Sequence, residues 1–279
     1  MDHALANRRL AAAGLFVALG LLPGARAVAQ ALGNASESRW LLGAAMVGTP
    51  EYPGSDRQVL KTRPLLAARF GRWRFSTGGA GALLDFGGAA AGPGASAELI
   101  ETDRLRLGLS LRVDSGRRAA SSDYLRGLPD VERTLRGRLY AAYKLGTQWS
   151  AGASVSQDLL GRDGGAVASL GLGYTLRLSP RTELSAGAGV DFGDARHLRS
   201  YYGITPQQSA AVGLPSFMPG AGGKDVHAGG VFTTALDADW VMFVGGGSSR
   251  LIGDAALSPL ARSTRAWGLS AGLAFRCCR

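Results

Sequence analysis

The sequence predicts an all-β protein, an antiparallel transmembrane β-barrel of about twelve strands, with ten as the alternative count. Three observations predict it. Apolar and polar residues alternate with a period of two in many segments, most segments run for about ten residues or more, and the links between them alternate between short and long. Alternation gives a strand one apolar and one polar face. A soluble sandwich also alternates, but its strands usually have about five or six residues, whereas a tilted membrane strand needs about 9–11.

The clearest segment is 104–114, where four leucines alternate with arginine, glycine and serine, so we expect Leu105, Leu107, Leu109 and Leu111 to face lipid. By the same reasoning, strands are expected at residues 40–47, 63–70, 72–86, 95–101, 104–114, 135–145, 148–158, 166–178, 182–193, 226–236, 240–249 and 266–275.

The predicted links give the topology. Tight turns rich in turn formers are expected at Gly71, 102–103, 146–147, 179–181 and 237–239. Longer links are expected at 48–62, 87–94, 115–134, 159–165, 194–225 and 250–265. Because short and long links alternate, every long link falls at the same end. Bacterial outer-membrane barrels have short periplasmic turns and long outer loops.

Five tryptophans support a membrane position, because an indole ring suits the membrane–water interface. They fall at or near the start of a predicted strand: Trp40, Trp73, Trp149, Trp240 and Trp267.

The N-terminal residues are predicted to be a signal peptide, 1–29. Arg8 and Arg9 precede the apolar run 10–22, and Ala27-Val28-Ala29 has the small-x-small pattern of a cleavage site. The run is shorter than the about 20 residues that span a bilayer. Residues 30–279 then form one barrel domain in the cell outer membrane of a Gram-negative envelope. The adjacent Cys277 and Cys278 are expected to be two thiols.

The formal net charge of +10 does not predict nucleic-acid binding, because the arginines alternate with apolar residues and form no run. Six of them fall on predicted inward positions: Arg104, Arg106, Arg112, Arg136, Arg138 and Arg177. One interpretation pairs them with Glu98, Glu183 and Asp191 across the lumen. The other is a narrow channel with anion preference, because rings of arginine select anions.

The sequence predicts no enzyme, no cofactor and no metal site. Two histidines follow the signal peptide, and no Gly-x-Ser-x-Gly motif accompanies them. A serine hydrolase needs a serine and a histidine side by side, but on one strand His197 and Ser200 would point to opposite faces. His227 falls on the inward set of its strand. Asp158 and Asp191 lack metal-ligand spacing around them.

The loops carry motifs that resemble the MltA-interacting protein (MipA/OmpV) family. The matching stretches are Tyr52-Pro53-Gly54-Ser55-Asp56, Leu125 to Val131, Tyr202-Gly203-Ile204-Thr205-Pro206, Gly213-Leu214-Pro215, Gly222 to Val226, and Leu251 to Ala256 with Ser258-Pro259. The positions taken as structural or partner contacts are Tyr52, Pro53, Gly54, Gly127, Leu128, Pro129, Asp130, Tyr202, Gly203, Gly253, Asp254, Ser258 and Pro259.

The resemblance implies a non-enzymatic outer-membrane protein, in contact with outer-membrane lipid, that scaffolds murein (peptidoglycan) hydrolases and synthases. In the predicted topology its motifs lie at the long-loop end, away from the periplasm in which those enzymes work. Two interpretations follow: the motifs pack the barrel mouth, or the outer face is itself functional. We expect packing, because Gly, Pro, Tyr and Asp suit tight loop conformations.

Overall fold

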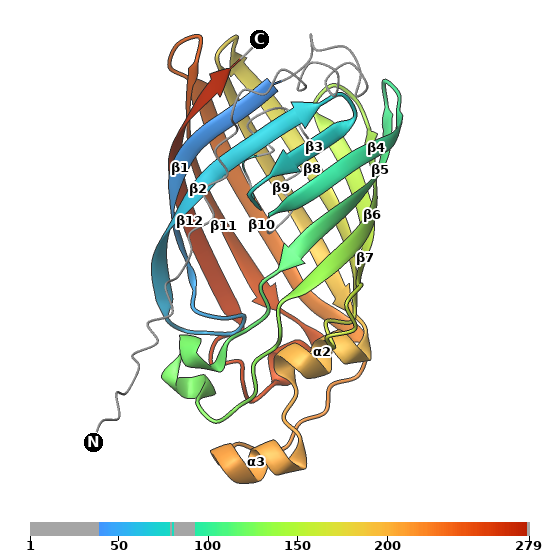
Figure 1. Cartoon of the computed structure of the whole chain (residues 1–279), viewed down its shortest axis with the longest axis vertical. Helices are drawn as coiled ribbons and strands as arrows, with labels where there is room; N and C mark the ends of the chain where they lie inside the picture. The colour runs from blue at the N-terminus through green and yellow to red at the C-terminus, as the bar shows by residue number, and fades with distance from the viewer. Residues whose placement is uncertain (1–38, 79, 81–92, 278–279) are drawn as a thin grey trace, which may run out of the picture. The chain divides into compact units, whose positions relative to one another are not determined.

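The computed structural model describes residues 39–78, 80 and 93–277, which form a closed antiparallel barrel of twelve strands (Figure 1). Each strand pairs with its sequence neighbours, and β1 closes the barrel against β12. The strands are β1 (Arg39–Pro50), β2 (Gln58–Phe70), β3 (Trp73–Ser76), β4 (Gly94–Glu101), β5 (Leu105–Asp114), β6 (Thr134–Lys144), β7 (Trp149–Asp158), β8 (Ala166–Ser179), β9 (Thr182–Gly193), β10 (Gly222–Ala235), β11 (Trp240–Leu251) and β12 (Arg265–Cys277). The predicted fold and strand number are confirmed.

The two faces of the barrel wall have opposite chemistry. On β5, Leu109 and Leu111 are 48% and 47% exposed on the outside, whereas Ser110 between them is 6% exposed and points inward. The outward alternation predicted for this segment is confirmed. A wall with apolar side chains outside and polar side chains inside is suited to lipid, not to water. No helix among the described residues is long and apolar enough to cross a membrane.

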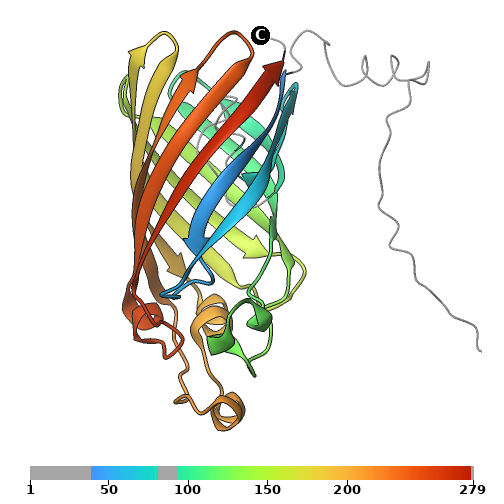
Figure 2. The same ribbon diagram turned by 90° about the vertical axis from the view of Figure 1, so that its left-hand side faces the viewer.

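The predicted alternation of short and long links is also confirmed (Figure 2). Short turns occupy 71–72, 102–104, 145–148, 180–181 and 236–239, and the links 51–57, 77–93, 115–133, 159–165, 194–221 and 252–264 are longer. At one short turn, the Asp237 carboxylate accepts hydrogen bonds from the backbone N–H groups of Asp239 and Trp240. Such side-chain-to-backbone bonds are why aspartate favours turns.

Tryptophans ring the outer surface near the short turns. Trp40, Trp73, Trp149 and Trp240 are all 40–53% exposed at that end of the wall, and Trp267 lies near the long-loop end. Two of them sandwich a phenylalanine, because the Phe275 ring is 5.7 Å from Trp40 and 5.5 Å from Trp240. This is the aromatic girdle expected at a membrane–water interface.

The third strand differs from the prediction. A strand over 72–86 was expected, but β3 ends at Ser76. The Thr77 hydroxyl accepts from Leu66 N–H and donates to the Pro64 carbonyl, so a side chain takes over strand pairing there. Gly78 has φ +50, which bends the chain. Residues 79 and 81–86 of the predicted strand lie outside the described residues.

Two predictions concern the chain ends. The predicted signal peptide, 1–29, lies outside the described residues, and so does Cys278. Cys277 is disulfide-bonded, so the expectation that it is a free thiol is wrong.

Candidate functional site: the capped lumen

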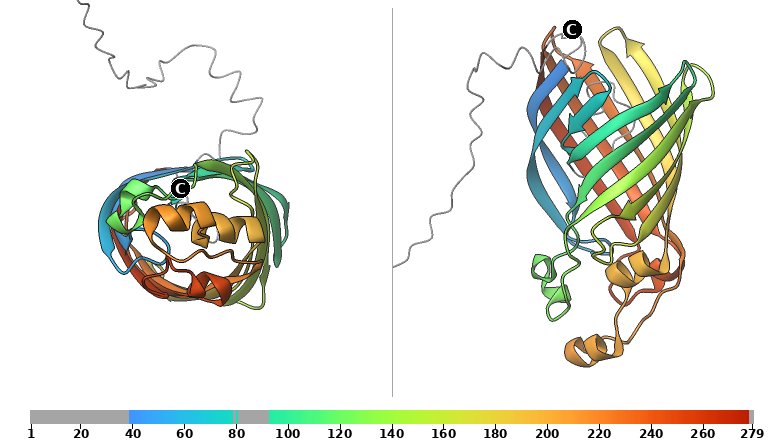
Figure 3. Two further views of the ribbon diagram at one scale, coloured as in Figure 1. Left: turned by 90° about the horizontal axis from the view of Figure 1, so that it is seen from below. Right: turned by 45° about the vertical axis from the view of Figure 1, so that its right-hand side comes forward.

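Four long links fold over the mouth of the barrel and form what we call the cap: residues 51–57, 115–133, 194–221 and 252–264. The cap contains α2 (Ala195–Tyr202), α3 (Pro206–Val212), α4 (Gly253–Leu257) and the single turns η3 (Ala119–Ser121) and η4 (Asp123–Leu125). Seen from the long-loop end, α2 lies across the barrel opening (Figure 3, left). These four links therefore contain helices and turns and are not irregular throughout.

Local sequence explains where the two longer helices of the cap begin. The Asp194 carboxylate accepts from His197 N–H and caps the start of α2. Helix α3 starts with a capping box between Thr205 and Gln208, has Pro206 in its first turn, and stops at Gly213 with φ +70. These are ordinary start and stop signals of helices.

Two apolar clusters hold the cap together. The first contains Val131, Leu198, Tyr201, Tyr202, Leu251 and Ala255. The second contains Tyr52, Leu125, Leu128, Ile204 and Leu260. Leu198, Leu125, Ile204 and Leu260 are fully buried. Because each cluster draws on several links, the cap packs as a small core in the way that a soluble domain does.

Hydrogen bonds join the same links. The Ser258 hydroxyl donates to the Tyr202 carbonyl at 2.6 Å, and the Tyr124 hydroxyl donates to the Pro259 carbonyl at 2.8 Å. Arg117 is 6% exposed and donates to the Tyr201 carbonyl at 3.0 Å. These contacts connect the links 115–133, 194–221 and 252–264 to one another.

The structure brings the family-motif residues together in the cap. Tyr52, Gly54, Leu128, Tyr202 and Ser258 are buried. Gly203, Asp254 and Pro259 are half-buried, and Pro53, Gly127, Pro129, Asp130 and Gly253 are exposed.

Several motif residues have a conformational or bonding reason for their identity. Gly54, Gly127 and Gly253 all have positive φ, at +97, +89 and +54, a region that other residues rarely adopt. The Asp130 carboxylate accepts from Ala119 N–H, and that of Asp254 accepts from Gly220 N–H at 2.8 Å.

Burial in the cap shifts the ionisation of several side chains. Burial lowers the pKa of His197 to about 4, so this imidazole is neutral at pH 7. Its Nδ1 donates to the Gly164 carbonyl at 2.9 Å. Burial raises the pKa of Tyr52 and of Tyr202 to about 12 and lowers that of Arg117. The cap interior is therefore a low-dielectric environment.

Below the cap, the predicted lumen arginines divide into two groups. Arg106, Arg112, Arg136 and Arg138 occupy inward positions on β5 and β6. Arg106 forms an ion pair with Glu98 at 3.3 Å, and Arg136 lies 3.6 Å from Asp114 and donates to the Gly164 carbonyl at 2.9 Å. Arg104 lies in the turn before β5 and is exposed. Arg177 lies near the short-turn end of β8 and is also exposed.

Only one of the three predicted acidic partners bonds to an arginine of the predicted set. Glu98 does, but the carboxylate of Glu183 accepts from the Ser185 hydroxyl and Asp191 pairs with Lys224. The sequence reasoning missed Arg74, whose guanidinium donates two hydrogen bonds to Glu98. Its strand has only four residues, too few to display a period. Its position between the aromatic residues Trp73 and Phe75, which point outward, could have indicated that Arg74 points into the lumen.

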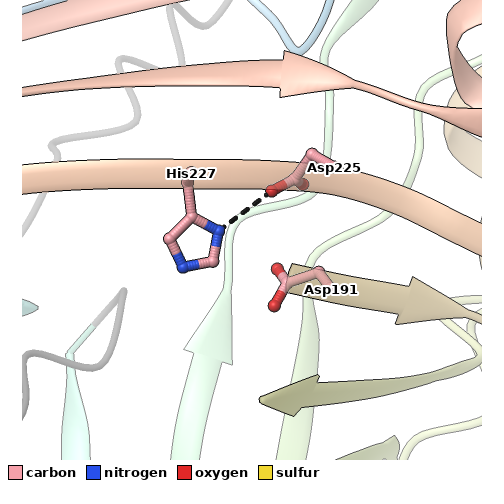
Figure 4. A group of neighbouring side chains, drawn as sticks. All are labelled: Asp191, Asp225 and His227. Atoms are coloured by element: carbon pink, nitrogen blue, oxygen red, sulfur yellow. Dashed lines mark hydrogen bonds and ion pairs between the residues drawn. The ribbon is translucent and has the colours of Figure 1, made fainter. Parts of the chain in front are cut away.

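A second charged cluster projects into the lumen from β9 and β10 (Figure 4). Asp191, Asp225 and His227 each offer a ligand atom, all within 4.8 Å of one another. Lys224 Nζ lies 3.0 Å from the Asp191 carboxylate and 3.2 Å from that of Asp225. A lysine cation therefore already compensates the two carboxylates. His227 points inward, as predicted, and its Nδ1 lies 3.1 Å from Asp225.

The serine and histidine considered for hydrolysis lie on α2, not on a strand. Ser200 Oγ donates to the Asp163 carbonyl at 2.6 Å, and the His197 ring bonds to Gly164. Both side chains therefore attach the cap to the β7–β8 link and not to each other.

A closed antiparallel barrel with an apolar outer wall, an aromatic girdle, short turns at one end and long loops at the other defines a transmembrane barrel of the outer membrane. The sequence profile described as "MltA-interacting protein MipA" matches residues 42–277. The chain belongs to this family, as its loop motifs predicted.

Comparison with solved structures finds other barrels at low similarity. The NanC porin is 8% identical with a TM-score of 0.46, over 84% of this chain and 98% of the porin. The KdgM porin is 9% identical with a TM-score of 0.41 over the same shares. An anion-selective porin from Comamonas acidovorans is 9% identical with a TM-score of 0.41, over 86% of this chain and 98% of the porin. No curated protein sequence matches the chain.

Proposed function

We propose that this barrel is a non-enzymatic scaffold that holds murein hydrolases and synthases at the outer membrane. The observation that carries the proposal is membership of a family described by its interaction with MltA. The cap supports it, because two packed apolar clusters stand across the long-loop mouth, where a solute would enter. The buried motif residues are then structural, and they keep this mouth closed.

The periplasmic partner meets the barrel at its short turns. These turns carry exposed polar residues, including Arg72, Asp103, Thr147 and Arg181, which can form hydrogen bonds with a soluble protein.

Photo-crosslinking tests the scaffold proposal. A crosslinking amino acid at Thr147 or Arg181 reports on the short-turn face, and the same residue at Gln207 or Arg126 reports on the outer surface of the cap. We expect murein enzymes in the crosslinked products from Thr147 and Arg181 only. Crosslinks from the cap positions alone, or no murein enzyme from any position, would overturn the proposal.

A narrow channel with anion preference is the second candidate, and the lumen wall favours it. On β8 to β12 many inward positions are glycine: Gly171, Gly173, Gly187, Gly189, Gly229, Gly245, Gly247, Gly268 and Gly272. Each of these glycines adds no side chain of its own to a lumen that β5 and β6 line with inward arginines. For this candidate the cap is a gate, and conduction requires it to move.

A further inference from the structure

Two arginines lie directly opposite each other on the outside of the barrel. Arg250, near the end of β11, pairs with Arg265 at the start of β12. Their neighbours Leu251 and Ser249 are buried and half-buried, whereas both arginines are exposed, so their side chains point away from the lumen. Opposite residues of an antiparallel pair have Cβ atoms about 4.5–5.5 Å apart, and like charges at that separation destabilise a sheet.

Among the described residues, neither guanidinium of this pair has a hydrogen bond or an ion pair, and the Asp56 carboxylate in the β1–β2 link is engaged by Arg262 at 3.0 Å. Arg57, in the adjoining β1–β2 link, is also exposed and adds a further positive charge to this rim. The outer rim between β11 and the β1–β2 link is therefore positive.

The position of Arg250 and Arg265 along the barrel axis indicates which layer of the membrane surrounds them. Arg250 follows Trp240, in the short-turn girdle, by ten residues on β11. Ten residues span about 33 Å of strand, and at a tilt of about 40° they rise about 25 Å, the height of the apolar band of such barrels.

On β12, Trp267 is 55% exposed, and Arg265 lies two residues beyond it toward the long-loop end. Tryptophan favours the interface, so both arginines lie at the level of the lipid headgroups on the outer side.

We propose that Arg250 and Arg265 together bind a phosphate group of an outer-leaflet lipid. A guanidinium presents planar paired donors that match phosphate oxygens, and charge-assisted bonds of this kind are strong. A phosphate between the two side chains replaces repulsion across the strand pair by two attractions. The ligand is a lipid phosphate and not a free ion, because both guanidiniums lie beside the apolar band into which the acyl chains pack.

The test measures lipid binding by purified full-length protein and by matched charge variants. Arg250→Gln with Arg265→Gln removes the pair. Arg72→Gln with Arg181→Gln removes the same charge from exposed positions at the opposite rim. The barrels are folded in phosphatidylcholine vesicles with or without diphosphoryl lipid A, and bound lipid is counted by native mass spectrometry after detergent release. Folding is checked by the shift in gel mobility on heating.

We expect lipid A to bind the wild type and the Arg72/Arg181 variant alike, and to bind the Arg250/Arg265 variant at least about tenfold more weakly. In pure phosphatidylcholine the Arg250/Arg265 variant folds as well as the wild type, because its substitutions remove a repulsion. Equal lipid A binding by all three proteins would overturn the proposal. Displacement of lipid A by inorganic phosphate at similar concentration would also overturn it, by showing a site for the free anion.

Discussion

The cap and the barrel wall differ in where their apolar side chains lie, inside the cap but on the outer surface of the wall. In the cap, the apolar side chains of Leu125, Leu198 and Ile204 are fully buried in the interior. In the wall, Leu109 and Leu111 are about half exposed to the lipid side, and the ion pair of Arg74 with Glu98 is buried inside. The cap follows the chemistry of a soluble domain, whereas the wall follows that of a membrane. One chain can combine both because long loops emerge at one end only.

The largest effect is expected inside the wall. Glu98→Gln leaves Arg74 buried without a full countercharge, and breaking a buried pair costs about 3–5 kcal/mol. We expect that loss in the unfolding free energy, measured by urea titration in lipid vesicles. Glu101→Gln is the matched control, since the Glu101 side chain is 49% exposed and its ion pairs are longer; it should cost less than about 1 kcal/mol. Similar losses for both variants would show that burial does not govern the lumen pairs.

In the cap, Ile204→Ala should cost about 2–5 kcal/mol of local stability, because a fully buried side chain leaves a cavity. The cap should then be cut faster by protease within 194–221 while the strands resist cleavage. Leu257→Ala is the control, because Leu257 is 72% exposed. If Ile204→Ala unfolded cap and wall together, the two regions would be one cooperative unit.

On the outer wall, Leu109→Arg should cost about 2–4 kcal/mol in bilayers. Gly108→Arg on the same strand is not a clean lumen control, because a Cβ there collides with the Tyr140 side chain. His227→Arg is better, since the His227 side chain faces the lumen and is 45% exposed. It should cost little. Equal costs for Leu109→Arg and His227→Arg would contradict the assignment of faces.

The smallest expected effect is a dependence of the stability of the cap on pH. The pKa of His197 is about 4 in the folded protein, against an ordinary value of 6.5. The unfolded chain therefore binds a proton over this interval and the folded chain does not, so stability present above pH 6.5 is lost as the pH falls toward 4. The loss is about 3 kcal/mol.

His197→Asn tests this dependence, because its amide can donate to Gly164 in place of Nδ1 but does not titrate. The unfolding free energy of the cap is measured by urea titration with a fluorescent dye attached at Gln207→Cys. In the His197→Asn variant this free energy should depend less on pH. An unchanged pH slope would exclude His197 as its source.

The wall could be predicted from the sequence because a period of two repeats in almost every strand. The prediction failed at β3, where the Thr77 hydroxyl replaces strand pairing, a contact that no period reveals. The cap could be predicted only in part. Its motifs were expected to pack the mouth, but the bonds of His197 and Ser200 to the β7–β8 link join residues that are distant in sequence. Ser55 and Ser258, which look like ordinary loop serines, are 3% and 4% exposed.

Ion conductance of single barrels in a planar bilayer tests the closed cap most directly. We predict that the wild-type protein gives no steady current, whereas Ile204→Ala, which loosens the cap but not the wall, gives discrete conducting steps. Leu257→Ala should remain silent. Steady anion-selective steps from the wild type, equal in size and frequency to those of Ile204→Ala, would contradict a closed mouth and make the channel the better account.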